Sequence, residues 1–406
     1  MSDFTRREFI QNSMLLAAGM AVFSCEDSGA ELKRDSPGML PENRPPKQIV
    51  IVGAGLSGLV AGYELTRAGH EVTILEARSR VGGRVLTLRT PFSDGHFAEA
   101  GAARIPPDHN LTLGYADHFG LTLDNFYPNS GLFVNYREGT RNIIPTENFL
   151  NDGPWPGSVP HKEYLKIREG SDKLPQAFST HLSEQIHLSM PVKSIEQKTK
   201  DVLIHTTDGT KFSADRALCT VPLTVLKKIN FIPALSPEKE QAGNGGYNYA
   251  DSTRVFIQFK NRFWENENLN AWGYSDWPEE IWQPTWDREG PKGVIMSYLR
   301  YSRATEIDQL SKEKRIEQVL NRWDNIFPGA NDQMESGISH AWALDQWSGG
   351  AWASPSSDQN QTLGSHIGKA EGRIHFAGEH ASEYHGWMQG ALVSGLRAAK
   401  EMHEEN

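Results

Sequence analysis

Three glycines and one acid in this chain have the spacing that a dinucleotide-binding site requires. Gly53, Gly55 and Gly58 form the pattern G-x-G-x-x-G, and Glu76 follows 18 residues after Gly58. The first glycine permits a tight turn, the second lets the backbone approach a pyrophosphate, and the third lets a helix pack close to the strand. An acid at this distance binds the hydroxyls of an adenosine ribose. The spacing therefore predicts a dinucleotide site rather than an isolated glycine turn.

Two strands and a helix must hold these four residues in place. The apolar run at residues 49–52 predicts a buried parallel strand, residues 56–68 predict a helix, and residues 72–75 predict a second strand that ends at Glu76. A glycine pattern alone is weak, but here every expected neighbour is present in order. The sequence therefore predicts a βαβ unit with its ligand at the strand ends.

The residues after Glu76 indicate which dinucleotide is bound. They read E-A-R-x-R-x-G-G-R, and two cations beside glycine backbone amides can hold a diphosphate, although a solvated basic loop is the alternative. The segment resembles the flavin amine oxidase family, in which the paired glycines and the last Arg wrap the FAD diphosphate. The resemblance implies non-covalent FAD held in this part of the chain by Gly53, Gly55, Ser57, Gly58, Glu76, Ala77, Arg78, Gly83 and Arg84.

Later segments resemble the same family. Residues 373–380 read as a short strand ending in Gly-Glu, and a helix is expected over residues 389–402. Residues 190–192 resemble the segment whose valine backbone holds the adenine, within a strand expected over residues 186–195. The resemblance adds these FAD contacts: Ala102, Ala103, Arg104, Val192, Glu379, Trp387 and Met388.

Three matches resemble the L-amino-acid oxidase branch in particular. Arg104 is the Arg of an E-x-G-x-x-R-x-P segment at residues 99–106 that resembles the one whose Arg binds the substrate carboxylate, and a planar guanidinium suits that contact. Tyr298 ends a strand whose Tyr donates to the same carboxylate. Residues 377–399 match the C-terminal signature, in which the carbonyl of Gly386 binds the substrate amine and Trp387 covers the flavin. Pairing of Arg104 with a surface carboxylate, and packing roles for the aromatics, are the alternatives.

One further aromatic completes the expected substrate slot. Trp352 follows paired glycines and matches the family's second aromatic wall, so two Trp faces would enclose a neutral amine. Trp272, Trp277, Trp282 and Trp286 have no motif around them and are expected to pack in the core, with one of them lining the pocket as the alternative.

Three positions depart from the family pattern. Arg254 stands where the family usually has a Lys that holds a water near the reactive flavin nitrogen, so we assign Arg254 a catalytic role in the reaction with dioxygen. Ala351 stands where some members bond a cysteine to the flavin, which implies non-covalent FAD. About 65 residues separate Arg104 from the segment at 170–175, room for only a short cap in place of the usual helical subdomain.

The first residues indicate export. Arg6 and Arg7 lie in a twin-arginine pattern, and a short apolar run follows at residues 14–23. Cys25 resembles the acylated residue of a lipoprotein, which would attach the protein to a membrane, and an ordinary signal cleavage is the alternative. A periplasmic or membrane-anchored protein is therefore expected.

Composition narrows the class of partner. The chain has 406 residues and a formal net charge of −10, which argues against nucleic acid as a partner. Its two cysteines provide no disulfide framework and no zinc spacing. The expected partners are a small L-amino acid, dioxygen and further copies of the chain in a homo-oligomer.

The resemblance implies an α/β FAD-binding domain of the Rossmann-like, glutathione-reductase type, discontinuous in sequence, with an α+β substrate domain. The expected order is a signal at 1–25, a tether at 26–46, FAD-binding parts at 47–104, 174–225 and 340–406, and substrate-domain parts at 105–173 and 226–339.

The implied reaction is oxidative deamination of an L-amino acid, with hydride transfer to FAD and hydrogen peroxide as a product. Three alternatives stay open: an oxidase of primary amines or polyamines, an amino-acid dehydrogenase that uses another electron acceptor, and a non-catalytic FAD-binding module.

Overall fold

The computed structural model describes residues 40–405. The predicted export signal, Cys25 and most of the tether lie outside these residues. Within residues 40–405, none of the helices is long and apolar enough to cross a membrane. The same part of the chain has no group of three His, Cys, Asp or Glu side chains placed to bind a metal ion.

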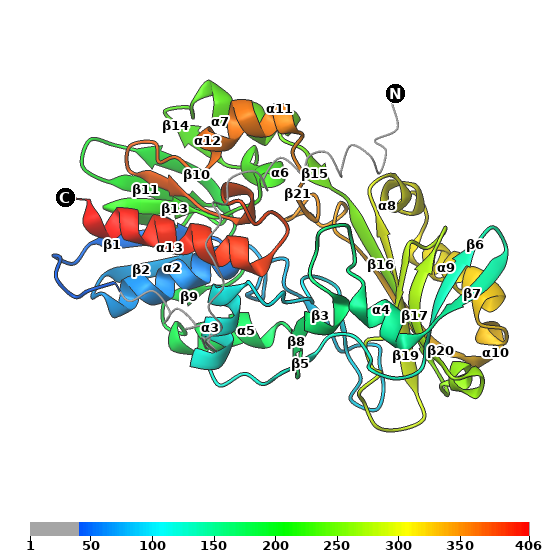
Figure 1. Cartoon of the computed structure of the whole chain (residues 1–406). Coiled ribbons are helices and arrows are strands. Elements are labelled where there is room, and N and C mark those ends of the chain that lie inside the picture. The colour runs from blue at the N-terminus through cyan, green and yellow to red at the C-terminus, as the bar shows by residue number, and fades with distance from the viewer. Residues whose placement is uncertain (1–39, 406) are drawn as a thin grey trace, which may run out of the picture.

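A five-stranded parallel sheet forms the centre of the FAD-binding domain, at the left of Figure 1. Its strands in spatial order are β22 (Ile374–Phe376), β13 (Arg216–Cys219), β1 (Gln48–Val52), β2 (Glu71–Leu75) and β9 (Ile186–His187). Strands from three separate stretches of the chain therefore lie side by side, which confirms a discontinuous domain.

Two long helices pack together beside this sheet: α2 (Leu56–Arg67) and α13 (Met388–Glu404). Glycines allow the close approach, because a Cβ on Gly395 would lie 2.4 Å from the carbonyl oxygen of Ser57. A Cβ on Gly62 would lie 2.7 Å from Ile74, so this glycine lets α2 lie close to β2. Both helices thereby begin beside the carboxyl ends of the strands, where ligands bind in open α/β sheets.

A second sheet has four strands and shares a hydrophobic core with the five-stranded sheet. Its spatial order is β12 (Lys211–Ala214), β11 (Val202–Thr206), β10 (Val192–Gln197) and β14 (Asn230–Ile232). The single strand predicted at 186–195 is therefore wrong: the chain leaves the five-stranded sheet after β9 and enters this sheet at β10. Ile229, Phe231 and Tyr247 pack in the same core, so the substrate domain begins later than residue 226. Short helices at this edge are α6 (Leu223–Leu226), α7 (Pro237–Gln241), η2 (Ala242–Gly246), α11 (Ser357–Gln359), η4 (Asn360–Gly364) and α12 (Ser365–Ile367).

The substrate domain is a seven-stranded sheet with helices on one face, at the right of Figure 1. Its order is β20 (Met334–Ala341), β16 (Ser252–Phe259), β19 (Gly293–Arg300), β18 (Glu280–Trp282), β17 (Leu269–Ser275), β6 (Leu132–Arg137) and β7 (Thr140–Ile144). The helix α9 (Lys312–Ile326) packs on β16 and β20 through Val319, Trp323 and Ile326. Neighbouring helices are η3 (Phe263–Glu267), α8 (Ser302–Ile307) and α10 (Ala330–Gln333).

The interval after Arg104 forms a short cap, as its length predicted. Its helices are α3 (Asn110–His118), α4 (Thr146–Asn151) and η1 (His161–Glu163), and its strands outside the large sheet are β5 (Leu123–Asn125) and β8 (Leu165–Ile167). The helix α5 (Lys173–His181) follows the cap and packs on α2 in the FAD-binding domain. Leu113 and Tyr115 of α3 pack in the core of the FAD-binding domain. The remaining short elements are β3 (Thr87–Leu88), β4 (Ala98–Glu99), β15 (Tyr249–Ala250), β21 (Trp352–Ala353) and η5 (Glu379–Ala381).

Candidate active site

One cavity of about 560 Å³ runs from the FAD-binding domain to the seven-stranded sheet. Every predicted site residue lines it except Gly58. The FAD-side residues placed there are Gly53, Gly55, Ser57, Glu76, Ala77, Arg78, Gly83, Arg84, Ala102, Ala103, Val192, Glu379 and Met388. Those expected to bind substrate or to act in the reaction are Arg104, Arg254, Tyr298, Trp352, Gly386 and Trp387. The fold therefore gathers residues from all parts of the described chain around one space.

The glycine turn has the backbone that FAD needs. Gly53 has φ of 110°, a value that other residues rarely adopt. A Cβ on Gly58 would lie 2.0 Å from the carbonyl oxygen of Gly53, so this glycine acts through packing and not by lining the cavity. A Cβ on Gly55 would meet nothing within 4 Å, because Gly55 faces open space. That space lies at the first turn of α2, where the diphosphate of a dinucleotide fits.

The carboxylate of Glu76 is fixed at the ribose end of the cavity. Its oxygens accept hydrogen bonds from the backbone N–H groups of Ala54 and Arg78, both at 2.8 Å. Glu76 is buried, and Met190 and Val192 line the same end. A buried carboxylate held by backbone donors suits a diol, so the residues present fit the adenosine of FAD.

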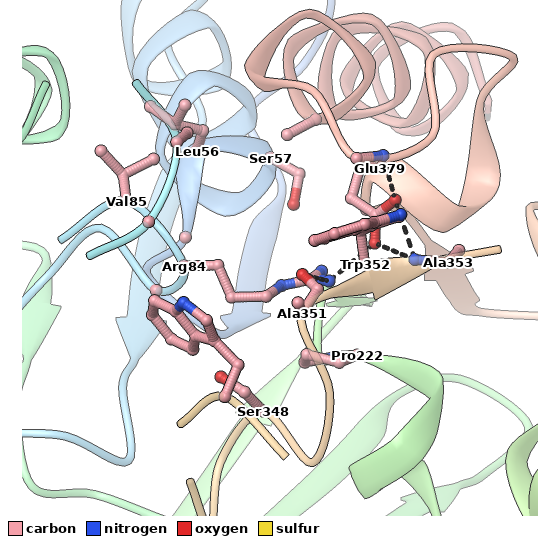
Figure 2. Close-up of a pocket in the computed structure, with 18 of the residues that line it drawn as sticks. Leu56, Ser57, Arg84, Val85, Pro222, Ser348, Ala351, Trp352, Ala353 and Glu379 are labelled. Carbon is pink, nitrogen blue, oxygen red and sulfur yellow. Dashed lines mark hydrogen bonds and ion pairs between the residues drawn. The ribbon is translucent and has the colours of Figure 1, made fainter. Parts of the chain in front are cut away.

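Arg84 crosses the middle of the cavity to a second buried acid. Figure 2 shows its side chain extending toward Ala351 and Glu379. Its Nη1 lies 2.7 Å from Oε1 of Glu379 and 3.0 Å from the carbonyl oxygen of Ala351. Burial alone would raise the pKa of Glu379, but Arg84 beside it holds that pKa below its ordinary value. Glu379 also accepts from the N–H of Gly386 at 2.8 Å, which fixes the loop before α13.

The substrate end of the cavity is built on one face of the seven-stranded sheet. Arg254 on β16 pairs with Tyr298 on β19, and Tyr298 pairs with Glu280 on β18. Because paired residues on adjacent strands point to the same face, these three side chains form a row. Arg300 lies on the same face, two residues after Tyr298.

Arg104 meets this row from the other side of the cavity. Its Nη1 donates to the hydroxyl of Tyr127 at 3.1 Å and lies 3.8 Å from Oε2 of Glu280. The other oxygen of Glu280 lies 2.9 Å from Nη2 of Arg300. Burial would lower the pKa of Arg104, but Tyr127 and Glu280 raise it, so the guanidinium carries its charge. Burial would raise the pKa of Glu280, but Arg300 and Arg104 lower it.

Arg254 lines the cavity but has only part of its guanidinium free. Its Nη1 donates to the carbonyl oxygens of Glu99 at 2.7 Å and Gly101 at 2.6 Å. The guanidinium carbon lies 4.2 Å from the centre of the Tyr298 ring. These contacts fix the segment that carries Ala102 and Ala103. Arg254 therefore positions a wall of the cavity, apart from any role in the reaction.

Four Trp rings line the substrate end of the cavity: Trp155, Trp282, Trp352 and Trp387. Gly386 has φ of 79°, and a Cβ there would lie 3.1 Å from the Trp352 ring, so glycine lets Trp352 lie this close. The ring centres of Trp155 and Trp387 are 6.0 Å apart. Trp282 lies between two cations, its ring centre 5.0 Å from the guanidinium carbons of both Arg104 and Arg254.

Sequence reasoning missed several residues of this site. Trp155 comes from the short cap, and Tyr127, Glu280 and Arg300 have no family motif around them. Of the Trp residues expected to pack in the core, Trp282 packs there and also lines the cavity, which was the alternative. One signal in the sequence could have found Arg300. Alternate side chains of a strand point to the same face, so Arg300 lies on the same face as Tyr298.

Comparison with known proteins identifies the family. The profile of flavin containing amine oxidoreductases matches residues 56–160 and 155–403, and the pyridine nucleotide-disulphide oxidoreductase profile matches residues 11–91. YobN of Bacillus subtilis (strain 168), which carries a provisional L-amino-acid oxidase name, is 30% identical, with 90% of this chain and 96% of YobN covered. The L-amino-acid oxidase of Pseudechis australis is 27% identical, with 88% and 87% covered.

The alignment with YobN spans 462 positions, more than the 406 residues of this chain, so YobN contains segments that this chain lacks.

Solved structures share the fold. Putrescine oxidase bound to putrescine has a TM-score of 0.75 at 19% identity, covering 88% of this chain and 99% of that one. Cyclohexylamine oxidase from Brevibacterium oxydans IH-35A has a TM-score of 0.77 at 16% identity, with 89% and 99% covered. The chain belongs to the family of flavin containing amine oxidoreductases, in its L-amino-acid oxidase branch, and is a flavoprotein oxidase that binds FAD.

Proposed function

We propose that this enzyme oxidises an L-amino acid to the 2-oxo acid, ammonia and hydrogen peroxide. The observation that carries the proposal is the balance of charge at the substrate end of the cavity. Arg104, Arg254 and Arg300 line that end, whereas Glu280 and Glu279 are the carboxylates that pair with them in residues 40–405. One guanidinium charge is left over, which matches one carboxylate on the substrate.

Arg104 is the best candidate to bind that carboxylate. Its contact with Glu280 is long, at 3.8 Å, so its donors are available for a closer acceptor. Tyr298 lines the same cavity and is the expected second donor. We expect the carbonyl of Gly386, next to Trp387 and close to the Trp352 ring, to orient the amine. Binding at both ends would hold the α-carbon in one place, and this positioning is the protein's main contribution to the rate.

The reaction removes two electrons and two protons from the amine, and water then hydrolyses the imino acid to the 2-oxo acid and ammonia. FAD supplies the acceptor for the electrons, and dioxygen takes them up to give hydrogen peroxide. Hydrolysis follows oxidation because water adds to the C=N bond of the imino acid, which the amine does not have.

Anaerobic mixing of the purified yellow protein with L-amino acids and with their decarboxylated amines tests the proposal. We expect loss of the flavin absorbance band with amino acids and little change with amines.

Arg104→Met should raise the KM for amino acids about 30- to 1,000-fold, since a charge-assisted bidentate contact contributes about 2–4 kcal/mol. Arg303→Met is the control, because Arg303 donates to a backbone carbonyl outside the cavity. If Arg104→Met impairs the oxidation of amino acids and of amines equally, Arg104 has a structural role, and an oxidase of primary amines or polyamines is favoured.

A dehydrogenase that passes electrons to another acceptor is the second candidate. The placement of Arg254 favours it, because Nη1 is occupied by two backbone carbonyls and the guanidinium rests on Tyr298. Normal anaerobic flavin reduction followed by slow reoxidation in oxygenated buffer would support this candidate over the oxidase.

We also propose export by the twin-arginine route, with Cys25 as a lipid attachment site, on the basis of the sequence pattern alone. Cell fractionation of the full chain and of an Arg6→Lys, Arg7→Lys double variant tests export. Cys25→Ala should release the exported protein from the membrane fraction if the cysteine is acylated.

A further inference from the structure

Tyr301 has a backbone conformation that side chains other than glycine rarely adopt. Its φ is 53° and its ψ is −131°. This combination is the one that a type II′ turn requires at its first central residue, and glycine is strongly preferred there. A tyrosine in this region costs free energy that the surrounding structure must supply.

The surroundings hold this conformation firmly. The N–H of Tyr301 donates to the carbonyl of Asp251 at 2.9 Å, and its own carbonyl accepts from the N–H of Thr305 at 3.0 Å. The hydroxyl of Thr305 also bonds the Asp251 carboxylate at 3.0 Å. The turn between β19 and α8 is therefore fixed from both sides.

The ring of Tyr301 lies at the cavity. Tyr301 lines it, 46% exposed, and its ring meets Trp352 edge to face with centres 6.3 Å apart. Tyr298, Arg300 and Arg104 line the same cavity. The Tyr301 ring is therefore within the space that the side chain of a substrate held by Arg104 and Tyr298 can enter. Strained residues at ligand cavities are characteristic of functional positions.

We propose that Tyr301 is a specificity-determining residue whose ring contacts the substrate side chain and selects for size and apolar surface at the cavity mouth. The inference rests on the proposed function. Charge cannot make this selection through Arg300, because Glu280 and Glu279 already pair with that guanidinium. The enzyme therefore distinguishes substrate side chains by their contact with the rings of Tyr301 and Trp352.

Three variants of Tyr301 separate the ring from the strain. Tyr301→Gly removes both, Tyr301→Ala removes the ring and keeps a Cβ in the strained region, and Tyr301→Phe keeps the ring. Glu138→Gly is the matched control, because Glu138 has φ of 50° in an exposed turn outside the cavity. Each holoenzyme is tested with L-alanine, L-leucine, L-phenylalanine and L-tryptophan, and its Tm is measured.

We expect Tyr301→Gly to raise the Tm by a few degrees, because glycine adopts this conformation without strain. The same variant and Tyr301→Ala should raise the KM for L-phenylalanine and L-tryptophan about 5- to 30-fold, with the KM for L-alanine changed less than about twofold. Tyr301→Phe should retain the wild-type preference, and Glu138→Gly should raise the Tm without any kinetic change. A structural role alone would lower the Tm and affect all four substrates equally, which would overturn the inference.

The wild-type enzyme separates failure of the inference from failure of the proposed function. If amines reduce its flavin and amino acids do not, the proposed function fails. The Tyr301 variants are then compared on butylamine and phenethylamine, where the same selective loss on the aromatic substrate supports the inference. Equal effects on both amines, or no flavin reduction by either substrate class, would overturn the inference.

Discussion

The carboxyl group of Glu99 is enclosed where the two domains meet. It accepts hydrogen bonds from the N–H of Ser171 at 2.8 Å and the hydroxyl of Thr87 at 2.9 Å. Burial raises its pKa from 4.5 to about 7, against these hydrogen bonds. Because the folded-state pKa is above the unfolded one, the protonated carboxyl stabilises the fold below pH 4.5, and this stabilisation is lost as the pH rises to 7.

We therefore expect Glu99→Gln to be more stable than the wild type at pH 8 by about 1–3 kcal/mol, with little difference at pH 4.5. A glutamine keeps one of the two acceptor oxygens, as the protonated carboxyl does, and cannot ionise. Urea unfolding at both pH values measures the difference, with Glu163→Gln as an exposed control. An equal difference at the two pH values would mean that Glu99 has no raised pKa.

Arg254 is the residue that we expect to affect the reaction of the reduced enzyme with dioxygen. Its Nη1 is occupied by two backbone carbonyls and its guanidinium lies on the Tyr298 ring, so we expect Arg254 to hold a water less well than a Lys would. We expect Arg254→Lys to speed the reaction of reduced enzyme with dioxygen, because the smaller ammonium keeps the charge and can hold that water. Stopped-flow reoxidation after anaerobic reduction measures the rate, and identical rates in both proteins would contradict this role.

At the scale of elements, Gly55 just before α2 and Gly58 in its first turn form a matched pair of glycines. A Cβ on Gly58 would collide with Gly53 within the protein, whereas a Cβ on Gly55 would enter open space in the cavity. We expect Gly58→Ala to destabilise the apoprotein by about 2 kcal/mol or more. Gly55→Ala should fold normally and weaken FAD binding by about 1–3 kcal/mol, because its methyl group would occupy space beside the diphosphate.

Urea unfolding of the apoproteins and FAD titration measure these two effects separately. If Gly55→Ala binds FAD as tightly as the wild type, the diphosphate does not pass over this turn.

At the scale of the whole molecule, one loop joins separate parts of the FAD-binding domain across the cavity. We call residues 342–350, between β20 and β21, the strap. Asp345 in the strap lies 2.5 Å from Nη2 of Arg78, which also donates to the hydroxyl of Ser348 at 2.9 Å. On its other side, Thr224 and Lys228 donate to the strap carbonyls of Ser348 and Gln346.

Because the strap crosses the cavity, FAD release should require its contacts to break. We expect Asp345→Ala to release FAD about 3- to 30-fold faster, since a charge-assisted hydrogen bond is lost while the remaining contacts hold. The rise in fluorescence of freed FAD after dilution measures this rate. Asp332→Ala, outside the cavity, is the control, and an unchanged rate in Asp345→Ala would show that the strap does not limit release.

The sequence by itself determined the FAD-binding part of this protein. The glycine turn, Glu76, the Gly-Glu strand end and the start of α13 are local structures, so neighbouring residues decide them and their pattern survives in sequence. The same holds for Arg104 and Tyr298, which resemblance to the family located. The short cap followed from a count of residues.

Only the tertiary structure decided what surrounds the substrate. Glu280 lies more than 170 residues after Arg104, and it meets Arg104 because the register of β18 and β19 places it beside Tyr298. Strand register and the path of the cap depend on packing across the whole sheet, which no local pattern specifies. For the same reason the strain at Tyr301 and the contact of Trp155 with Arg104 became visible only in the fold.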